Sequence, residues 1–129
     1  TDGGARGNPG PAGIGLVIKD ENGELLYSHG AYIGETTNNV AEYSALIKAL
    51  EESVNLGGTS LRIQMDSELI VKQMQGVYKI KEPTLQELAA KVIALLKKFD
   101  HYTFVHVRRE FNKEADAMVN QALDAQALN

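Results

Sequence analysis

The sequence predicts a single α/β domain in which helices pack on a mixed β-sheet. Short apolar stretches typical of strands alternate along the chain with segments whose apolar residues recur at helical spacing. The 129 residues are one domain's worth of chain and suffice to bury a single core. Neither an internal repeat nor a linker interrupts residues 1–129, so we expect one domain over the whole chain.

The expected order of elements is hairpin, helix, strand, helix, helix, strand, helix. Strands are predicted at residues 13–20, 24–33, 61–66 and 102–107. Helices are predicted at residues 40–55, 67–75, 83–99 and 112–128. Because strands alternate with helices, the sheet should be mixed and covered by layers of helices.

Turn and cap residues justify the first elements. The hairpin closes at DENG, residues 20–23, which separates two apolar strands. The first helix follows the loop GETTNN, residues 34–39, in which Thr37 or Asn38 is the candidate N-cap. This helix should end before Gly57, because glycine is common just past the last helical turn.

The later elements carry similar boundary residues. Ser67 is a candidate N-cap for the second helix, which should end at Gly76. The third helix is expected to follow Pro83 and to run to about residue 99. Asn112 is the candidate N-cap of the last helix.

The chain opens on a glycine-rich segment, TDGGARGNPG. Its composition predicts a turn that begins at Asp2 and lets a ligand approach the backbone closely. The segment lacks the lysine and the hydroxyl of a phosphate-binding loop, so that function is excluded. Asp2 needs an element to hold it, and the chain starts at Thr1 without a methionine. We therefore expect a trimmed chain whose first strand is largely clipped.

Composition excludes several classes of function. The chain has no cysteine, which excludes disulfides and thiolate metal sites and favours a reducing, cytoplasmic location. No apolar run approaches the roughly 18 residues of a membrane helix and no signal peptide is visible, so no membrane partner is expected. The net charge of −4 argues against sequence-blind phosphate binding, unless two divalent cations belong to the working protein and neutralise it.

Four acidic residues stand where an ordinary soluble domain would not place a carboxylate. Asp2 lies in the glycine-rich segment, Glu42 on the apolar face of the first helix, and Asp66 at the end of an apolar strand. Asp116 lies in the first turn of the last helix, beside apolar positions. Each has an ordinary alternative, because acidic residues favour helix N-termini and turns. Together they predict one site that gathers all four around divalent metal.

Four longer segments resemble those of type 1 ribonuclease H in their order and spacing. They are TDGGARGNPGPAGIG, TTNNVAEYSAL, MDSELIVKQM and EFNKEADAMVNQAL, and together they span essentially the whole chain. The four acidic residues match the family's Asp-Glu-Asp-Asp positions. The resemblance implies a ribonuclease H-like fold, a five-stranded mixed sheet whose first three strands are antiparallel, with helices on both faces.

The resemblance also implies an activity. Members of this family are metal-dependent endoribonucleases that cleave the RNA strand of RNA–DNA hybrids with two Mg²⁺ or Mn²⁺ ions, leaving 5′-phosphate and 3′-hydroxyl ends. Hard cations prefer oxygen ligands, which agrees with an all-carboxylate set. The expected partner is therefore an RNA–DNA hybrid, with duplex RNA as a further candidate substrate and a monomeric enzyme.

The residue roles that the resemblance implies are as follows. Asp2 would bridge the two ions, Glu42 and Asp66 would hold one, and Asp116 would hold the other. The residues matching substrate-binding positions are Gly3, Asn8, Thr37, Asn38, Asn39 and Ser67. Asparagine amides and helix N-termini suit the 2′-hydroxyls and phosphates of an A-like duplex, although helix capping is an alternative role for the residues before the first helix.

The chain departs from better-known members of the family at three places. The basic protrusion between the middle helices is replaced by GVYKIKEP, residues 76–83, which contains Lys79 and Lys81. The loop before Asp116, RREFNKEAD, has no histidine. Glu35 stands where some members carry a basic residue. These departures place the chain on the short branch without the protrusion.

Two other functions compete with hybrid cleavage. One is a non-catalytic module that binds hybrid or RNA, which the four intact carboxylates argue against. The other is a nuclease or transposase-type enzyme of the same broad fold that acts on DNA, against which Asn8 and the run Thr37, Asn38 and Asn39 favour RNA.

Overall fold

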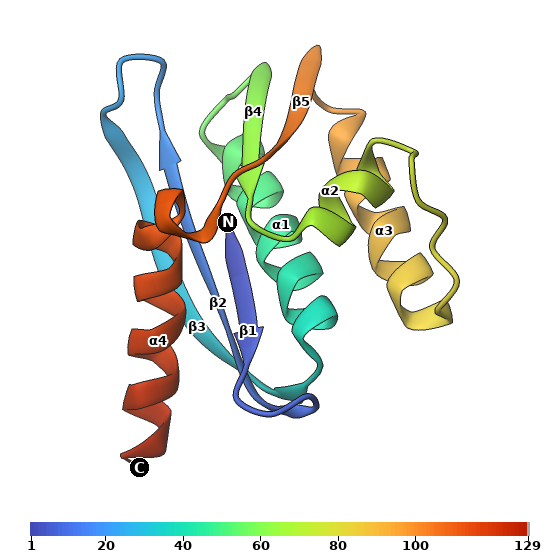
Figure 1. The fold of residues 1–129 in the computed structure, drawn as a ribbon. Coiled ribbons are helices and arrows are strands. Elements are labelled where there is room, and N and C mark those ends of the chain that lie inside the picture. The colour runs from blue at the N-terminus through green and yellow to red at the C-terminus, as the bar shows by residue number, and fades with distance from the viewer. Residues whose placement is uncertain (129) are drawn as a thin grey trace.

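Strands and helices alternate along the chain as the sequence predicts (Figure 1). The structure, a computed structural model, describes residues 1–128. In that range the strands are β1 Asp2–Ala5, β2 Gly10–Lys19, β3 Leu25–Thr36, β4 Ser60–Met65 and β5 His101–His106. The helices are α1 Asn38–Asn55, α2 Glu68–Met74, α3 Pro83–Leu96, the short 3-10 helix η1 Arg109–Phe111, and α4 Lys113–Ala127.

The five strands pair in the predicted mixed arrangement. Strands β1, β2 and β3 form an antiparallel sheet in that order, and β4 pairs with β5 in parallel. The two groups meet where the amino nitrogen of Thr1 donates a hydrogen bond to the carbonyl oxygen of Gln64 at 3.0 Å. Among the described residues, β1 and β4 are otherwise not paired with each other.

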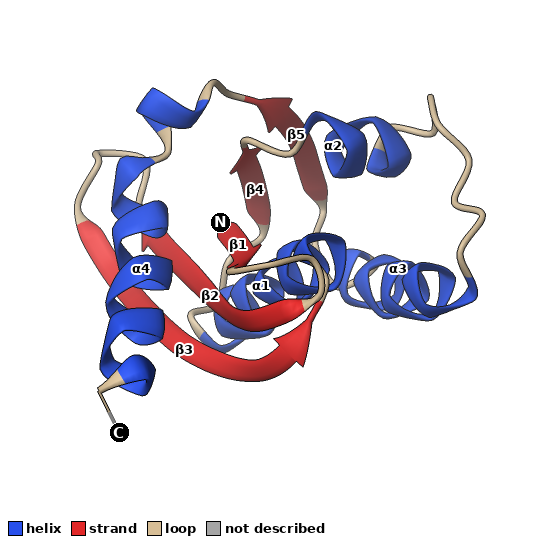
Figure 2. Cartoon of the chain, turned by 60° about the horizontal axis from the view of Figure 1, so that its bottom comes forward, coloured by secondary structure: helices blue, strands red, loops and turns tan. Residues whose placement is uncertain are grey.

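Helices cover both faces of the antiparallel sheet (Figure 2). Helix α4 packs on one face, and α1 packs on the other, between the sheet and α3. Outside the antiparallel sheet, the largest fully buried side chains come from α1, α2, α3 and β4. They are Tyr43, Leu46, Leu50, Met65, Ile70, Val71 and Val92. This core fixes α1 and β4 relative to one another, since interiors are close-packed and resist displacement. None of the helices in residues 1–128 is both long and apolar enough to cross a membrane.

The first strand differs from the prediction. Asp2 was expected to begin a turn, whereas Asp2–Ala5 forms the short strand β1, and the turn lies at residues 6–9. The strand is possible because Gly3 lies directly against the backbone of Ala41 in α1, where a Cβ would overlap it. Pairing of Asp2 opposite Gly15 then overrides the local turn tendency of the glycines.

Other boundaries differ by a few residues. Strand β2 begins at Gly10 and β3 continues to Thr36, because these ends pair with each other across what looked like loops. Helix α3 ends at Leu96, three residues before the predicted end. Such displacements are ordinary at element ends, where tertiary pairing decides the last turn or ladder step.

All three predicted N-cap positions are confirmed, but only two of these residues cap their helix with the side chain. The hydroxyl oxygens of Thr37 and Ser67 accept hydrogen bonds from the N–H groups of Val40 and Ile70, each at 3.3 Å. Asn112 occupies the N-cap position of α4 but makes no cap bond with its side chain. Its amide instead donates to the carbonyl oxygen of Thr1 at 2.8 Å, which ties the start of α4 to the start of β1.

Helix α4 sits close to the sheet because glycines face it. A Cβ at Gly15 would overlap the carbonyl oxygen of Ala115 and lie 2.9 Å from the Cβ of Met118. At Gly4, in the neighbouring strand, the nearest atom to such a Cβ would be the Cγ1 of Val119 at 3.9 Å. The two glycines therefore differ sharply in how much side chain the packing tolerates.

We predict that Gly15→Ala lowers the free energy of unfolding by about 1–3 kcal/mol, the usual cost of forcing an extra methyl into a well-packed interface. Gly4→Ala is the matched control and should stay within about 0.5 kcal/mol of the wild type, or gain slightly from a stiffer unfolded chain. Urea denaturation of both variants measures the difference. Equal stabilities for the two variants would show that α4 is not held at the distance described.

Candidate active site

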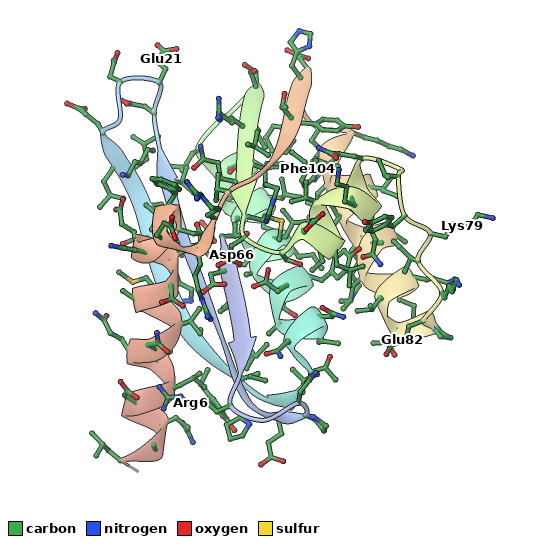
Figure 3. All side chains as sticks on the ribbon, in the orientation of Figure 1. Arg6, Glu21, Asp66, Lys79, Glu82 and Phe104 are labelled. Carbon is green, nitrogen blue, oxygen red and sulfur yellow. The ribbon has the colours of Figure 1, made fainter. Side chains whose placement is uncertain are left out.

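Three carboxylates converge where β1, β4 and α1 meet. Asp2 is the first residue of β1, Asp66 directly follows β4, and Glu42 lies on the buried side of α1. One oxygen atom from each of these three side chains lies within 4.8 Å of the other two. Figure 3 labels Asp66 near the start of β1, between α1 and α4. The structure thus brings together three of the four residues expected to form one site.

The fourth carboxylate, Asp116, lies at the same cleft but outside this close group. It comes from the first turn of α4, and its Oδ2 accepts a hydrogen bond from the side-chain amide of Asn120 at 3.3 Å. The carboxylate is near enough to Asp2 to contribute to that residue's raised pKa. All four predicted acidic residues therefore line one cleft, with Asp116 on the wall opposite α1.

Glu42 is held by the backbone of β1. Its Oε1 accepts a hydrogen bond from the N–H of Gly3 at 2.5 Å, and only 4% of the residue is exposed. Its other oxygen, Oε2, is buried and has no hydrogen-bond partner. A buried acceptor without a partner costs free energy unless a cation or donor reaches it.

Burial raises the pKa of two of these groups. It is the main cause that brings the pKa of Asp2 to about 9, and the neighbouring Glu42, Asp66 and Asp116 raise it further. Burial likewise raises the pKa of Glu42 to about 7, although hydrogen bonds from Asp2 and from Gly3 act in the opposite direction. Without a cation, burial and the neighbouring carboxylates therefore favour protonation of the pair formed by Asp2 and Glu42.

The donor set fits a hard divalent cation. All the converging atoms are carboxylate oxygens, which Mg²⁺, Mn²⁺ and Ca²⁺ prefer, and the chain has no cysteine to offer sulfur. Such a cation would give the unpartnered Oε2 of Glu42 a positive partner and would favour the ionised form of the buried carboxylates. Asp2, Glu42 and Asp66 can hold such an ion.

The cleft also gathers several of the expected substrate-binding residues. Gly3, Asn38, Asn39 and Ser67 line it together with the acidic residues. Asn8 and Thr37 are not among its lining residues, but both contact the start of α1, which lines it. Thr37 caps α1, as described above, and the side-chain oxygen of Asn8 accepts a hydrogen bond from the backbone N–H of Asn38.

Hydrogen bonds join the glycine loop to the start of α1. The Oδ1 of Asn8 accepts the N–H of Asn38 at 3.1 Å, and the Oδ1 of Asn38 accepts the N–H of Ala5 at 2.7 Å. The two amide oxygens are therefore occupied, whereas no hydrogen bond engages either NH₂ group among the described residues. Both side chains thus present donors rather than acceptors.

Sequence reasoning missed three polar residues of the cleft. Arg6, Arg109 and Asn120 line it, and none was assigned to the site. Arg109 belongs to η1, in the loop RREFNKEAD, for which the sequence indicated only the absence of a histidine. The available signal was two adjacent arginines shortly before Asp116 in an otherwise acidic chain. Asn120 could have been found from its spacing, since residues four apart on a helix are neighbours.

Known proteins resemble the chain over nearly all of its length. A ribonuclease HI of Halobacterium salinarum is 42% identical over 123 residues, which is 95% of this chain and 62% of that protein. A bifunctional protein of Mycobacterium tuberculosis is 44% identical over 128 residues, 98% of this chain and 35% of that protein. The chain therefore spans only about a third to three fifths of these curated relatives.

Two solved structures that resemble this chain are close to it in length. The LC11-RNase H1 crystallised with an RNA/DNA hybrid is 56% identical, with a TM-score of 0.93 that covers 99% of this chain and 96% of that one. RNase H1 from Halobacterium salinarum is 41% identical with a TM-score of 0.93, covering 96% of this chain and 94% of that one.

The fold and its acidic cleft define the class of ribonuclease H-like domains. A family model described as reverse transcriptase-like matches residues 1–122. Together with the relatives above, this match shows that the chain belongs to the type 1 ribonuclease H family. In this chain a loop joins α2 to α3, in agreement with the expected absence of a long protrusion there.

We predict that Asp2→Asn relieves a pH-dependent cost in metal-free protein. The folded-state pKa of Asp2 is raised from 3.8 to about 9, so the wild type loses stability as the pH rises between these values. Asparagine cannot ionise, so the variant should gain unfolding free energy relative to the wild type over the same range. Denaturation in chelator at several pH values measures this difference.

Saturating Mg²⁺ or Mn²⁺ provides the control for this experiment. A cation that binds only the folded state stabilises it by mass action, and the wild type should gain more than Asp2→Asn. A stability difference that does not change with pH, together with no response to metal, would mean that Asp2 is not part of a carboxylate cluster.

Proposed function

We propose that this chain is a metal-dependent endoribonuclease, a phosphodiester hydrolase that cleaves the RNA strand of RNA–DNA hybrids. The observation that carries the proposal is the convergence of Asp2, Glu42 and Asp66 within 4.8 Å, with Asp116 on the same cleft. The LC11 enzyme, which is 56% identical, was crystallised with an RNA/DNA hybrid, and this supports the choice of substrate.

In this proposal the four carboxylates would hold two Mg²⁺ or Mn²⁺ ions: Asp2 would contribute to both, Glu42 and Asp66 to one, and Asp116 to the other. Two such ions supply Lewis-acid activation of a water and stabilisation of the leaving oxygen in an in-line displacement, which leaves a 5′-phosphate and a 3′-hydroxyl. The N–H of Gly3 orients the Glu42 carboxylate, and burial of Asp2 and Glu42 excludes bulk water from their side of the site.

Recognition of RNA rests on the amide donors beside the cleft. Asn8 and Asn38 have their oxygens engaged by backbone N–H groups, so only their NH₂ groups can face a substrate. These groups suit the oxygens of 2′-hydroxyls, which DNA lacks, in the wide minor groove of an A-like duplex. We infer that Asn39, Ser67 and Gly3, which line the same cleft, contact the same strand.

Cleavage of three matched duplexes tests this function. With Mg²⁺ or Mn²⁺ the protein should cut the RNA strand of a hybrid and leave duplex DNA intact, and a duplex-RNA arm measures the further substrate. We predict that Asp66→Asn abolishes cleavage yet binds hybrid within about tenfold of the wild type, because the substitution removes a metal ligand and no substrate contact. Gel assays and fluorescence anisotropy measure the two quantities.

The outcomes separate the competing functions. A chain that binds hybrid without cutting it is a binding module, and one that cuts duplex DNA equally well is a DNA nuclease. Turnover of more than a few per cent in Asp66→Asn at saturating Mg²⁺ would remove Asp66 from the metal site.

We also predict that Asn38→Ala lowers kcat/KM on hybrid. The expected loss of transition-state stabilisation is about 1–3 kcal/mol, the scale of one lost polar contact. The loss should shrink on a hybrid whose RNA strand carries deoxyriboses around the scissile bond, because the contact is then already absent. This comparison is a double-mutant cycle between enzyme and substrate. Fully additive losses would mean that Asn38 does not act through a 2′-hydroxyl.

A further inference from the structure

The acidic cleft is lined by two cations, and they lie at different ends of it. Arg109 comes from η1, just ahead of α4, whereas Arg6 follows the last residue of β1 in the glycine loop. Figure 3 shows Arg6 beside α4, at the opposite end of β1 from Asp66. A nucleic-acid strand that crosses the carboxylates along β1 would therefore reach Arg6.

The distance suits a phosphate near the cut, but not the one being cut. Arg6 lies four positions after Asp2 in the sequence, and four steps of 3.3 Å along a strand span about 13 Å. One nucleotide of a duplex strand advances by about 3.4 Å along the axis, so about 13 Å corresponds to a few nucleotides. Arg6 would therefore reach the backbone at one side of the scissile bond.

The guanidinium of Arg6 forms an ion pair that is exposed at the protein surface. Its Nη2 contacts the Oδ1 of Asp124 on α4 at 2.6 Å, and the two side chains are 44% and 66% exposed. Exposed ion pairs of this kind contribute little to stability and are screened by salt, so exchanging Asp124 for another anion costs little. Guanidinium groups are well suited to phosphate, which they can bind through two parallel N–H donors.

We propose that Arg6 binds a backbone phosphate of the strand that lies across the carboxylates, a few nucleotides from the scissile bond. Asp124 competes with that phosphate and keeps Arg6 extended along the cleft before substrate arrives. This inference rests on the proposed function, because it requires that a nucleic-acid strand occupies the cleft. It assigns a substrate-binding role to a residue that a purely structural account would treat as a surface ion pair.

The same helix carries a matched control. Lys19 contacts Glu114 of α4 at 2.7 Å, with side chains 42% and 64% exposed, so this pair resembles the Arg6–Asp124 pair in geometry, charge and exposure. Neither Lys19 nor Glu114 lines the acidic cleft. Neutralising either cation changes the net charge equally, so a difference between the two variants reflects the position and the chemical type of the cation and not the net charge.

The test measures hybrid affinity against salt concentration with Asp66→Asn as the background, so that substrate stays intact. Arg6→Gln should weaken binding about five- to tenfold at low salt and reduce the slope of log K against log salt by about 1, as expected for one lost phosphate contact. Arg6→Lys should restore most of the slope. Lys19→Gln should leave affinity within about twofold and the slope unchanged.

Removing the competitor gives the complementary result. Asp124→Asn should tighten hybrid binding about two- to fivefold, and this gain should vanish in the Arg6→Gln, Asp124→Asn double variant. Glu114→Gln, which removes the same charge from the same helix, should produce a smaller gain that does not depend on Arg6. A merely structural ion pair would move the melting temperature without moving the salt slope.

Three results would overturn the inference. Equal slopes for Arg6→Gln and its background would show that no phosphate contact was lost, and equal losses for Arg6→Gln and Lys19→Gln would show a general charge effect. In both cases hybrid binding and cleavage by the wild type would still stand, so only the role of Arg6 would fail. A wild type that neither binds nor cuts hybrid would overturn the proposed function and this inference together.

Discussion

The site depends on how closely β1 lies against α1. Because Gly3 has no side chain, its backbone rests on Ala41, and its N–H reaches the buried carboxylate of Glu42. This single contact sets the position of Asp2 relative to Glu42, since Asp2 directly precedes Gly3 in the strand. Any larger residue at Gly3 would separate the strand from the helix and open the carboxylate cluster.

Burying these carboxylates lowers the stability of the folded protein locally, and the rest of the fold compensates for this loss. Asp2 and Glu42 are only 6% and 4% exposed, and one oxygen of Glu42 has no partner. Ordinary folding would not retain such groups, because burying a charge is unfavourable unless a partner compensates it. A dense apolar core between α1, α3 and β4 holds the elements in place while the cluster repels itself. Functional sites commonly break local rules in this way.

The positions of the acidic residues along their elements followed from the sequence, but their mutual geometry did not. Helical periodicity put Glu42 on the buried side of α1, and the cap at Ser67 followed from its residue type. The extended form of residues 2–5 did not follow, because glycines favour turns until a partner strand is in place. Arg109 was missed for a similar reason, since only the tertiary fold brings η1 to the cleft.

The bond between Asn112 and Thr1 has a consequence for how the molecule assembles. It joins positions 111 residues apart and fixes the carbonyl directly before Asp2 to the residue that begins α4. Closing so long a loop is entropically expensive and tends to come late in folding. On the ribosome, the first two thirds of the chain would carry three of the four carboxylates with nothing to complete the cleft. The nascent protein would thus acquire its full charge cluster only when the last helix emerges and docks.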